Sequence, residues 1–296
     1  MKPISYVRTL QGVLAFTGLL GTQVGAEAQS HPRVSPDGSR VAHFQFDLEA
    51  ETADILVTDL ETGETSRQPT GQSWSVNPAW SPEGDRLTFI GGPRGMSDIW
   101  DVYEVRLGDN SVGALTQTPE REMHTQISPS GDRIAFVRVT QGPHVWILDR
   151  GDPVARQLTT GPGRDFHPKW APDGLSLVFD RTDGAGQSRI IQVSATDGAE
   201  TVMAEAPETG RIGLPNVAPS GEVYAIVSTG VQSSLVRLEA RGVPDAVLRS
   251  GPGERFGAFD FHPDGRSVFL SVTDGDDQTR LYRVEVETGA RSLVHE

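Results

Sequence analysis

The stretch Ser35-Pro36-Asp37-Gly38 decides the fold, because the same four-residue pattern returns five more times along the chain. The other copies are Ser81-Pro82-Glu83-Gly84, Ser128-Pro129-Ser130-Gly131, Ala171-Pro172-Asp173-Gly174, Ala218-Pro219-Ser220-Gly221 and His262-Pro263-Asp264-Gly265. Proline presets φ at the second position of a turn, and glycine accepts the positive φ that closes it. Each copy therefore predicts a tight turn between two strands.

The turn prolines recur at a nearly constant distance along the chain. Successive prolines are 46, 47, 43, 47 and 44 residues apart. A period of about 40–45 residues is typical of one four-stranded blade of a β-propeller. A β-rich segment such as Arg86–Ile90 follows each turn, and no useful helical periodicity appears after residue 28. The sequence predicts an all-β fold, a six-bladed β-propeller of four-stranded antiparallel blades.

The first 28 residues have the features of a secretory signal peptide. Lys2 and Arg8 precede an apolar run over residues 10–20, and Ala26 and Ala28 supply the small residues that a signal peptidase reads. The run is shorter than the roughly 20 apolar residues that a membrane span needs. We expect cleavage near Ala28 and export to the periplasm or the outside of the cell, with no membrane-spanning segment. A buried first helix is the alternative.

Residues 29–296 are predicted to be the propeller. The approximate blade bounds are 30–75, 76–122, 123–165, 166–212, 213–256 and 257–296. Because the first turn comes early, the last blade is expected to contain only residues after about 256. The ring would then close by packing of the last blade against the first, with no shared sheet or only a short one.

Composition excludes several classes of function. The chain has 26 basic and 40 acidic residues, a net charge of −14 and no cysteine. Without cysteine there is no disulfide scaffold, no thiolate metal site and no cysteine nucleophile. The acidic balance argues against nucleic acid as a partner, because binding a phosphate backbone requires clustered lysine and arginine.

The turn and its surroundings resemble the TolB-type propeller repeat. The resemblance rests on the Ser-Pro-Asp-Gly turn, on aromatic residues two positions before its proline, such as Trp80 and Trp170, and on Leu-Thr endings such as Leu158-Thr159. It covers residues 30–296 and implies a TolB-like propeller. TolB proteins carry an α/β domain ahead of the propeller, and we expect this chain to lack it.

Counting back from each turn proline separates the two faces of the preceding strand, because side chains alternate along a strand. Two residues before the proline the side chains are large and apolar, and we expect them to pack between blades: Val34, Trp80, Ile127, Trp170, Val217 and Phe261. The residues three and five positions before it are expected to border the central tunnel. Those that we predict to bind a ligand there are His31, Arg33, Asn77, His124, Gln126, His167, Lys169, Asn216 and Asp260.

Histidine occupies the fifth position before the proline in three units, at His31, His124 and His167. Neutral imidazole is a common metal ligand. Because packed sheets lie about 10 Å apart, blades 1 and 4 would face each other across roughly 20 Å, so His31 is not expected to reach the other two. We therefore predict no metal site and no cofactor. A divalent metal near His124 and His167 is the alternative.

The loops between blades are expected to lie on the tunnel face and to supply docking residues. They run over residues 70–76, 116–123, 159–166, 204–213 and 250–257. Aromatic residues and arginine are enriched at interface hot spots. In these loops they are Trp74, Arg121, Arg164, Phe166, Arg211, Arg255 and Phe256.

The sequence holds no Gly-x-Ser-x-Gly element and no other catalytic signature, so we expect no catalytic residues. The leading interpretation is an exported, monomeric, non-catalytic propeller that binds a protein or peptide partner of the cell envelope on its tunnel face. The alternative is a carbohydrate-active enzyme similar to a polyuronide lyase. Lyases built from related propellers use tunnel histidines, and His124 with Gln126 beside His167 resembles that arrangement.

Overall fold

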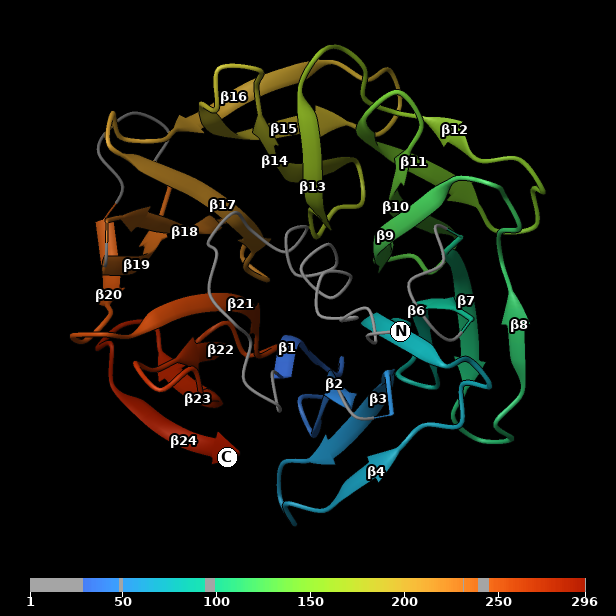
Figure 1. Cartoon of the computed structure of the whole chain (residues 1–296), viewed down its shortest axis with the longest axis horizontal. Coiled ribbons are helices and arrows are strands. Elements are labelled where there is room, and N and C mark those ends of the chain that lie inside the picture. The colour runs from blue at the N-terminus through green and yellow to red at the C-terminus, as the bar shows by residue number, and fades with distance from the viewer. Residues whose placement is uncertain (1–28, 48–49, 94–98, 231, 239–244, 296) are drawn as a thin grey trace, which may run out of the picture.

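The computed structural model describes residues 29–47, 50–93, 99–230, 232–238 and 245–295. The predicted signal peptide, residues 1–28, lies outside the described residues. The described part contains 24 strands and no helix, and its sheets are arranged around a common centre (Figure 1). The chain is an all-β propeller of four-stranded antiparallel blades.

Four of the sheets are separate and four-stranded. Their strands are β9 (Arg121–Ile127), β10 (Arg133–Val139), β11 (Pro143–Asp149) and β12 (Arg156–Gln157); β13 (Arg164–Trp170), β14 (Ser176–Thr182), β15 (Ser188–Ser194) and β16 (Glu200–Glu205); β17 (Gly210–Val217), β18 (Val223–Thr229), β19 (Gln232–Arg237) and β20 (Asp245–Arg249); and β21 (Arg255–Phe261), β22 (Ser267–Thr273), β23 (Thr279–Glu285) and β24 (Arg291–His295).

The first eight strands form one larger sheet. They are β1 (Gln29–Val34), β2 (Arg40–Asp47), β3 (Thr52–Asp59), β4 (Thr65–Arg67), β5 (Trp74–Trp80), β6 (Arg86–Gly92), β7 (Asp101–Arg106) and β8 (Val112–Ala114). Within β1–β4 and within β5–β8 every pairing is antiparallel. A parallel pairing of β3 with β5, at Ala53 and Trp74, joins the two groups.

The ring closes by packing of one sheet against another, as predicted. Strands β21–β24 form a sheet of their own, and β1 pairs with β2. Strand β1 lies against β21, β22 and β23, and Val34 shares a hydrophobic cluster with Phe269 and Leu281. The carboxylate of Asp260, on β21, accepts a hydrogen bond of 2.9 Å from the backbone N–H of Val34, on β1.

The six predicted turns are present. In each turn the glycine N–H donates to the carbonyl of the residue three positions earlier, over 2.8–2.9 Å. The glycines have positive φ, from 68° at Gly174 to 92° at Gly221. Serine at the first position adds a second bond, because the Ser35 hydroxyl accepts the backbone N–H of Arg40 at 2.9 Å. The sequence repeat is therefore a repeat of turn chemistry.

The predicted packing residue before the turn is buried in five of the six copies, and Val217 is partly buried. Tryptophan at this position is held by the preceding unit. The Trp80 indole N–H donates to the Arg33 carbonyl at 2.8 Å, and the Arg40 guanidinium lies 4.7 Å from the Trp80 ring centroid. Trp170 has the same contacts, with the Gln126 carbonyl at 3.3 Å and Arg133 at 4.8 Å.

A buried carboxylate links neighbouring sheets at two equivalent places. Asp165, on β13, is fully buried and accepts from the Thr159 hydroxyl at 2.6 Å, from Arg181 at 2.6 and 2.9 Å, and from His144 at 3.2 Å. The Thr159 hydroxyl in turn accepts the Val145 N–H. This network accounts for the Leu-Thr ending of the repeat: threonine connects the third strand of one sheet to the first strand of the next.

The equivalent network one unit earlier is built around Glu122, on β9. Its carboxylate is also fully buried and accepts from the Thr116 hydroxyl at 2.5 Å and from Arg138 at 2.7 and 2.9 Å. Burial raises the pKa of Glu122, while the bonds from Thr116 and Arg138 oppose that rise. The two networks tie consecutive sheets through charged hydrogen bonds that are shielded from water.

We predict that Asp165→Ala lowers the free energy of unfolding by about 3–5 kcal/mol, because it leaves buried Thr159 and His144 without their acceptor and Arg181 with Glu200 as its remaining counter-ion. Urea unfolding measures the change. The matched control is Glu287→Ala, which removes an exposed carboxylate and should change stability by less than about 0.5 kcal/mol. Similar small effects of both substitutions would show that the network contributes little.

Candidate functional site

The innermost strands are interrupted at the position where the sequence places its histidines. His31, Asn77, His124, His167 and Leu214, each five residues before a turn proline, have φ between 51° and 58°. The pairing register of the strand shifts at this point in all six units. Positive φ is uncommon for residues other than glycine, although histidine and asparagine adopt it more readily than most. A β-bulge of this kind redirects a side chain.

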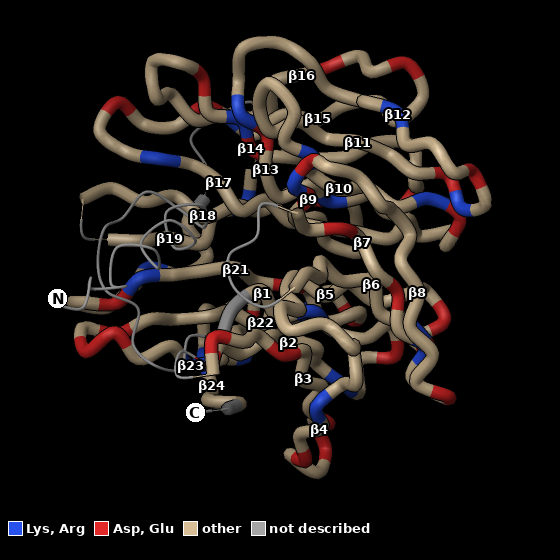
Figure 2. The backbone as a smooth tube through the Cα atoms, turned by 45° about the vertical axis from the view of Figure 1, so that its right-hand side comes forward, with Lys and Arg blue, Asp and Glu red and all other residues tan. Residues whose placement is uncertain are grey.

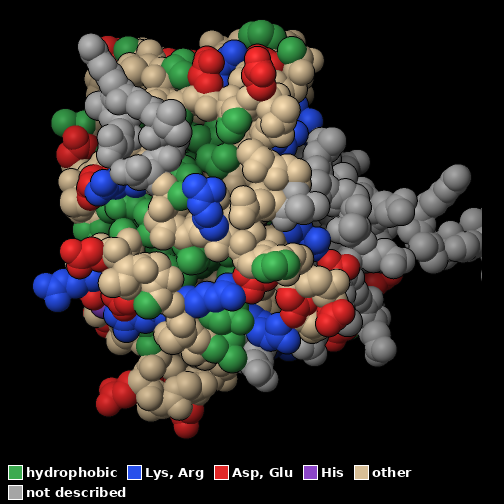
Figure 3. All heavy atoms as spheres, turned by 90° about the vertical axis from the view of Figure 1, so that its left-hand side faces the viewer, with side chains coloured by type: hydrophobic (Ala, Val, Ile, Leu, Met, Phe, Trp, Pro, Cys, Tyr) green, Lys and Arg blue, Asp and Glu red, His purple; other side chains and the backbone are tan. Residues whose placement is uncertain are grey.

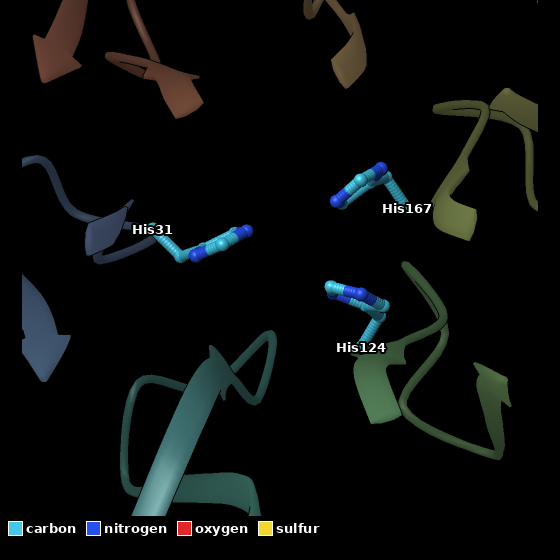
Figure 4. A group of neighbouring side chains, drawn as sticks. All are labelled: His31, His124 and His167. Carbon is cyan, nitrogen blue, oxygen red and sulfur yellow. The ribbon is translucent and has the colours of Figure 1, made fainter. Parts of the chain in front are cut away.

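The bulges bring three imidazoles together at the centre of the ring. His31 comes from β1, His124 from β9 and His167 from β13, and their rings point toward one another (Figure 4). One ring nitrogen from each lies within 4.8 Å of the others. The ring centroids of His124 and His167 are 4.3 Å apart, and that of His31 is 5.7 and 5.8 Å from them.

The expectation that His31 does not reach the other two histidines is wrong. It used the spacing of packed sheets, about 10 Å, which describes the faces of blades. The innermost strands converge on the axis, and the bulge turns each histidine inward from its strand. The prediction that there is no metal site rested on the same spacing and loses that support.

Hydrogen bonding and burial set the state of these rings. His167 Nδ1 lies 2.7 Å from Asp180 Oδ1, so that Nδ1 carries the proton that it donates to the carboxylate. Burial lowers the pKa of His31 and His124 well below the usual value, and the nearby cationic side chains lower it further. His31 and His124 are therefore neutral near pH 7.

A second group of predicted tunnel residues is joined by Asp260. Its Oδ1 lies 2.8 Å from Asn216 Nδ2 and 3.4 Å from Lys169 Nζ, and its Oδ2 accepts the Val34 N–H. These bonds connect β21 with β17, β13 and β1 across the centre of the ring. Burial and the neighbouring Arg33 lower the pKa of Lys169 to about 7, and Asp260 opposes that change.

Arg33 is buried in the same group, beside Lys169 and Asp260. Its Nη1 donates to the Pro32 carbonyl at 3.1 Å, whereas its Nε has no hydrogen-bond partner among the described residues. Burial lowers its pKa, and Asp260 opposes this. Gln126, on β9, occupies the position that corresponds to Arg33, and its Oε1 is buried without a partner in the described part of the chain. Asn77, on β5, occupies the bulged position, as His31 does on β1.

The predicted docking residues divide into two groups. Trp74 and Phe256 are 7% and 6% exposed and belong to the hydrophobic core, so the expectation that they supply a docking surface is wrong. Both lie within the innermost strands, where alternation turns large apolar side chains toward the neighbouring sheet. Phe166 is partly buried, and its ring packs edge-on against His124 with a centroid distance of 6.0 Å.

The four predicted arginines lie at equivalent places in four consecutive sheets. Arg121, Arg164 and Arg255 are the first residues of β9, β13 and β21, and Arg211 is the second residue of β17. Each precedes a turn proline by eight residues and the bulged position by three. We call Arg121, Arg164, Arg211 and Arg255 the arginine rim.

Each arginine of the rim has a local contact. The Arg121 guanidinium lies over the Trp100 ring and that of Arg164 over Phe166, at 5.1 and 5.5 Å from the centroids. Arg211 donates to the Thr182 hydroxyl at 3.3 Å, and Arg255 pairs with Asp277 at 2.6 Å. Arg164 and Arg211 are exposed, and the other two are partly exposed.

The rim contrasts with the rest of the surface. Acidic residues are distributed over the turns and loops around the ring (Figure 2), and on one outer side positive and negative side chains alternate without a patch of a single sign (Figure 3). The rim therefore repeats an arginine at one end of the innermost strands on a chain of net charge −14, and one of its members, Arg255, is paired with Asp277.

Sequence reasoning missed the carboxylates that support the site. Asp180, on β14, orients His167, and Glu122 and Asp165 hold the starts of β9 and β13. It also missed the bulge, for which a signal was available. Proline directly follows the bulged residue at Pro32, Pro78, Pro168 and Pro215, and proline inside a strand indicates a bulge or an edge.

Solved structures with the same fold are numerous. TolB from Acinetobacter baumannii superposes with a TM-score of 0.73 at 15% identity, covering 100% of this chain and 71% of that one. The fold is that of the TolB-like β-propellers. A putative TolB from Agrobacterium tumefaciens has a TM-score of 0.67 at 19% identity, covering 81% and 87% of the two chains.

The TolB-like fold is shared with enzymes. The oligogalacturonate lyase of Vibrio parahaemolyticus has a TM-score of 0.65 at 9% identity, covering 93% of this chain and 80% of that one. At these identities the likeness shows the fold alone. No protein-family model matches the chain.

Three curated relatives of this TolB-like chain match in part. An uncharacterised protein of Agrobacterium fabrum is 28% identical over 159 residues, an uncharacterised peptidase of Bacillus subtilis 30% over 123, and the Tol-Pal system protein TolB of Anaeromyxobacter dehalogenans 29% over 122. These matches cover 50%, 40% and 40% of this chain, and 53%, 18% and 27% of the relatives' lengths.

In the described part of the chain no helix is long and apolar enough to cross a membrane.

Proposed function

We propose that this chain is an exported, TolB-like propeller that binds an acidic segment of a cell-envelope protein at the arginine rim. The repetition of arginine at one position of four consecutive sheets carries the proposal. The arginines attract a negatively charged segment at short range, while the net charge of −14 repels it at longer range, so the rim favours the specificity and position of binding rather than its rate. The resemblance to TolB supports a protein partner in the envelope.

The proposal includes six blades. The eight-stranded sheet divides naturally at the pairing of Ala53 with Trp74, because that parallel pairing joins two groups that are otherwise antiparallel and four-stranded. Each group also contains one Pro-Gly turn between its first two strands, as the four separate sheets do. The innermost strands of six blades would then be β1, β5, β9, β13, β17 and β21.

The bulged histidines lie three residues inward from the rim. At about 3.3 Å per residue, a segment bound at the rim would approach the tunnel centre to within roughly 10 Å. There Arg33 and Lys169 add positive charge, and Asn216 adds a polar group. The rim thus lies beside a buried cluster of polar and charged side chains at the centre of the ring.

We predict that replacing both Arg164 and Arg211 by alanine weakens binding of a fluorescent oligoglutamate peptide by about two- to thirtyfold at low salt, since an exposed ion pair contributes about 0.2–1 kcal/mol. The dependence of the dissociation constant on salt concentration should also become shallower. Fluorescence anisotropy measures both quantities.

The matched control replaces Arg67 and Arg106 by alanine. These two arginines are exposed at the ends of β4 and β7, away from the innermost strands, and their removal changes net charge equally. Equal weakening by both pairs of substitutions would contradict a role for the rim.

In an envelope extract, a protein captured by the wild type and the control but lost with the rim variant would be the partner.

The converging histidines favour one second function, a polyuronide lyase. Elimination from a uronate requires positive charge near the carboxylate and a group that accepts the proton from the adjacent carbon. Arg33 and Lys169 supply the charge, and the neutral imidazoles can accept a proton. The fold is compatible, because an oligogalacturonate lyase shares it.

For this second function, incubation with polygalacturonate should produce unsaturated products that absorb in the ultraviolet, and His124→Ala should reduce the rate by at least about 100-fold. The control His262→Ser restores the residue that three other turns carry at that position and should leave the rate unchanged. A wild-type protein that releases no unsaturated product from polygalacturonate or alginate would exclude it.

A further inference from the structure

The three imidazoles at the centre of the ring have buried nitrogens that nothing in the described structure satisfies. Both ring nitrogens of His31 and Nε2 of His167 are buried without a hydrogen-bond partner among the described residues. Buried polar atoms are almost always paired, and an exception calls for a water or an ion at that place. These unpaired nitrogens belong to two of the three rings whose nitrogens converge within 4.8 Å.

The lone pair of His167 is directed by its neighbour. Asp180 accepts the Nδ1 proton at 2.7 Å, which leaves the lone pair on Nε2, the nitrogen that lacks a partner. The Asp180 carboxylate also lies 3.3 Å from the backbone N–H of Leu214 and is buried, so its position is fixed. A carboxylate behind a histidine in this way is the usual outer support of a metal-ligating imidazole.

The other two rings are also suited to ligation. His31 and His124 are 5% and 6% exposed, and one ring nitrogen of each lies within 4.8 Å of the others in the group. The three rings project from β1, β9 and β13, which are innermost strands of separate sheets or sheet segments. Strand pairing before and after each bulge holds the backbone of the three histidines in place.

The geometry permits coordination after a small movement. Nitrogen ligands of a tetrahedral zinc ion lie about 3.3 Å from one another, given zinc–nitrogen distances of about 2.0–2.1 Å. Nitrogens that already lie within 4.8 Å can reach this spacing by rotation of the side chains. The bulged backbone need not move.

The donor set selects the class of metal. Calcium and magnesium prefer oxygen ligands, whereas three imidazoles without thiolate suit zinc and its neighbours among the transition metals. Arg33 and Lys169 lie nearby, and their positive charge disfavours a cation that is held by electrostatic attraction alone. The carboxylates of Asp180 and Asp260 offset part of this positive charge. Only an ion that forms strong bonds to nitrogen would be retained in this setting.

We propose that His31, His124 and His167 form a three-histidine site for one divalent transition-metal ion of the zinc class, with Asp180 as the residue that positions His167. Three protein ligands leave a fourth coordination position for water or an anionic group of a ligand. The site goes beyond the protein-binding proposal and does not depend on it, because the rim can bind an acidic segment with or without the ion.

The test uses the exported chain without a histidine tag, stripped with a chelator and titrated with Zn²⁺ alone. Calorimetry should show one ion per chain. His31→Ala and His124→Ala should each weaken binding by at least about tenfold, and Asp180→Asn by about 10–100-fold. Substitution with Co²⁺ should give the visible absorption of a tetrahedral nitrogen site, and this signal should be lost in His124→Ala.

His262→Ser is the matched control, because it removes a histidine that lies at a turn and should bind Zn²⁺ as the wild type does. Circular dichroism without metal checks that each variant is folded, and His124→Gln, of similar size and neutral, replaces any alanine variant that is not. Failure of the folded wild type to bind one equivalent of Zn²⁺, or equal binding by the wild type and the His124 variants, would overturn the proposal. Binding of oligoglutamate in the presence of chelator tests the rim separately.

Discussion

The left-handed residue in the innermost strands is the constraint on which the centre of this protein depends. Regular alternation along a strand would set the side chains on alternate faces without convergence, whereas a residue with φ near 55° redirects its side chain. Five of the six innermost strands share this conformation, which costs free energy in every residue type except glycine. The surrounding turns and strand pairings maintain it, and the result is three imidazoles that point toward one another at the centre of the ring.

Polar bonds between sheets supply the rigidity that such a centre needs. Packing of apolar residues between blades is not directional, so it does not by itself fix the rotation of one sheet relative to the next. The buried carboxylates of Glu122 and Asp165 and the indole N–H groups of Trp80 and Trp170 are directional. These bonds join consecutive units close to the innermost strands. They therefore restrict the movement of the histidines, which lie on those strands.

Charged side chains are distributed unevenly between the turns and the innermost strands. Most carboxylates lie in turns and loops, where they accept local backbone hydrogen bonds and interact with water, as Asp37 does with Ser39. The arginine rim and the buried Arg33 and Lys169 lie along the innermost strands instead. At the centre the buried Arg33 and Lys169 lie beside the carboxylate of Asp260, and Asp180 pairs with His167.

The sequence by itself determined the turns, the period and the four-stranded units, because each depends on neighbours within a few positions: proline and glycine set a turn, and alternation sets the two faces of a strand. It did not determine that His31, 93 residues before His124, meets it at the axis, nor that Trp74 and Phe256 are buried. Those facts depend on how far the blades converge and on a bulge that shifts the register of each strand. Only the closed tertiary structure decides them, since distances across the ring are set by all the blades together.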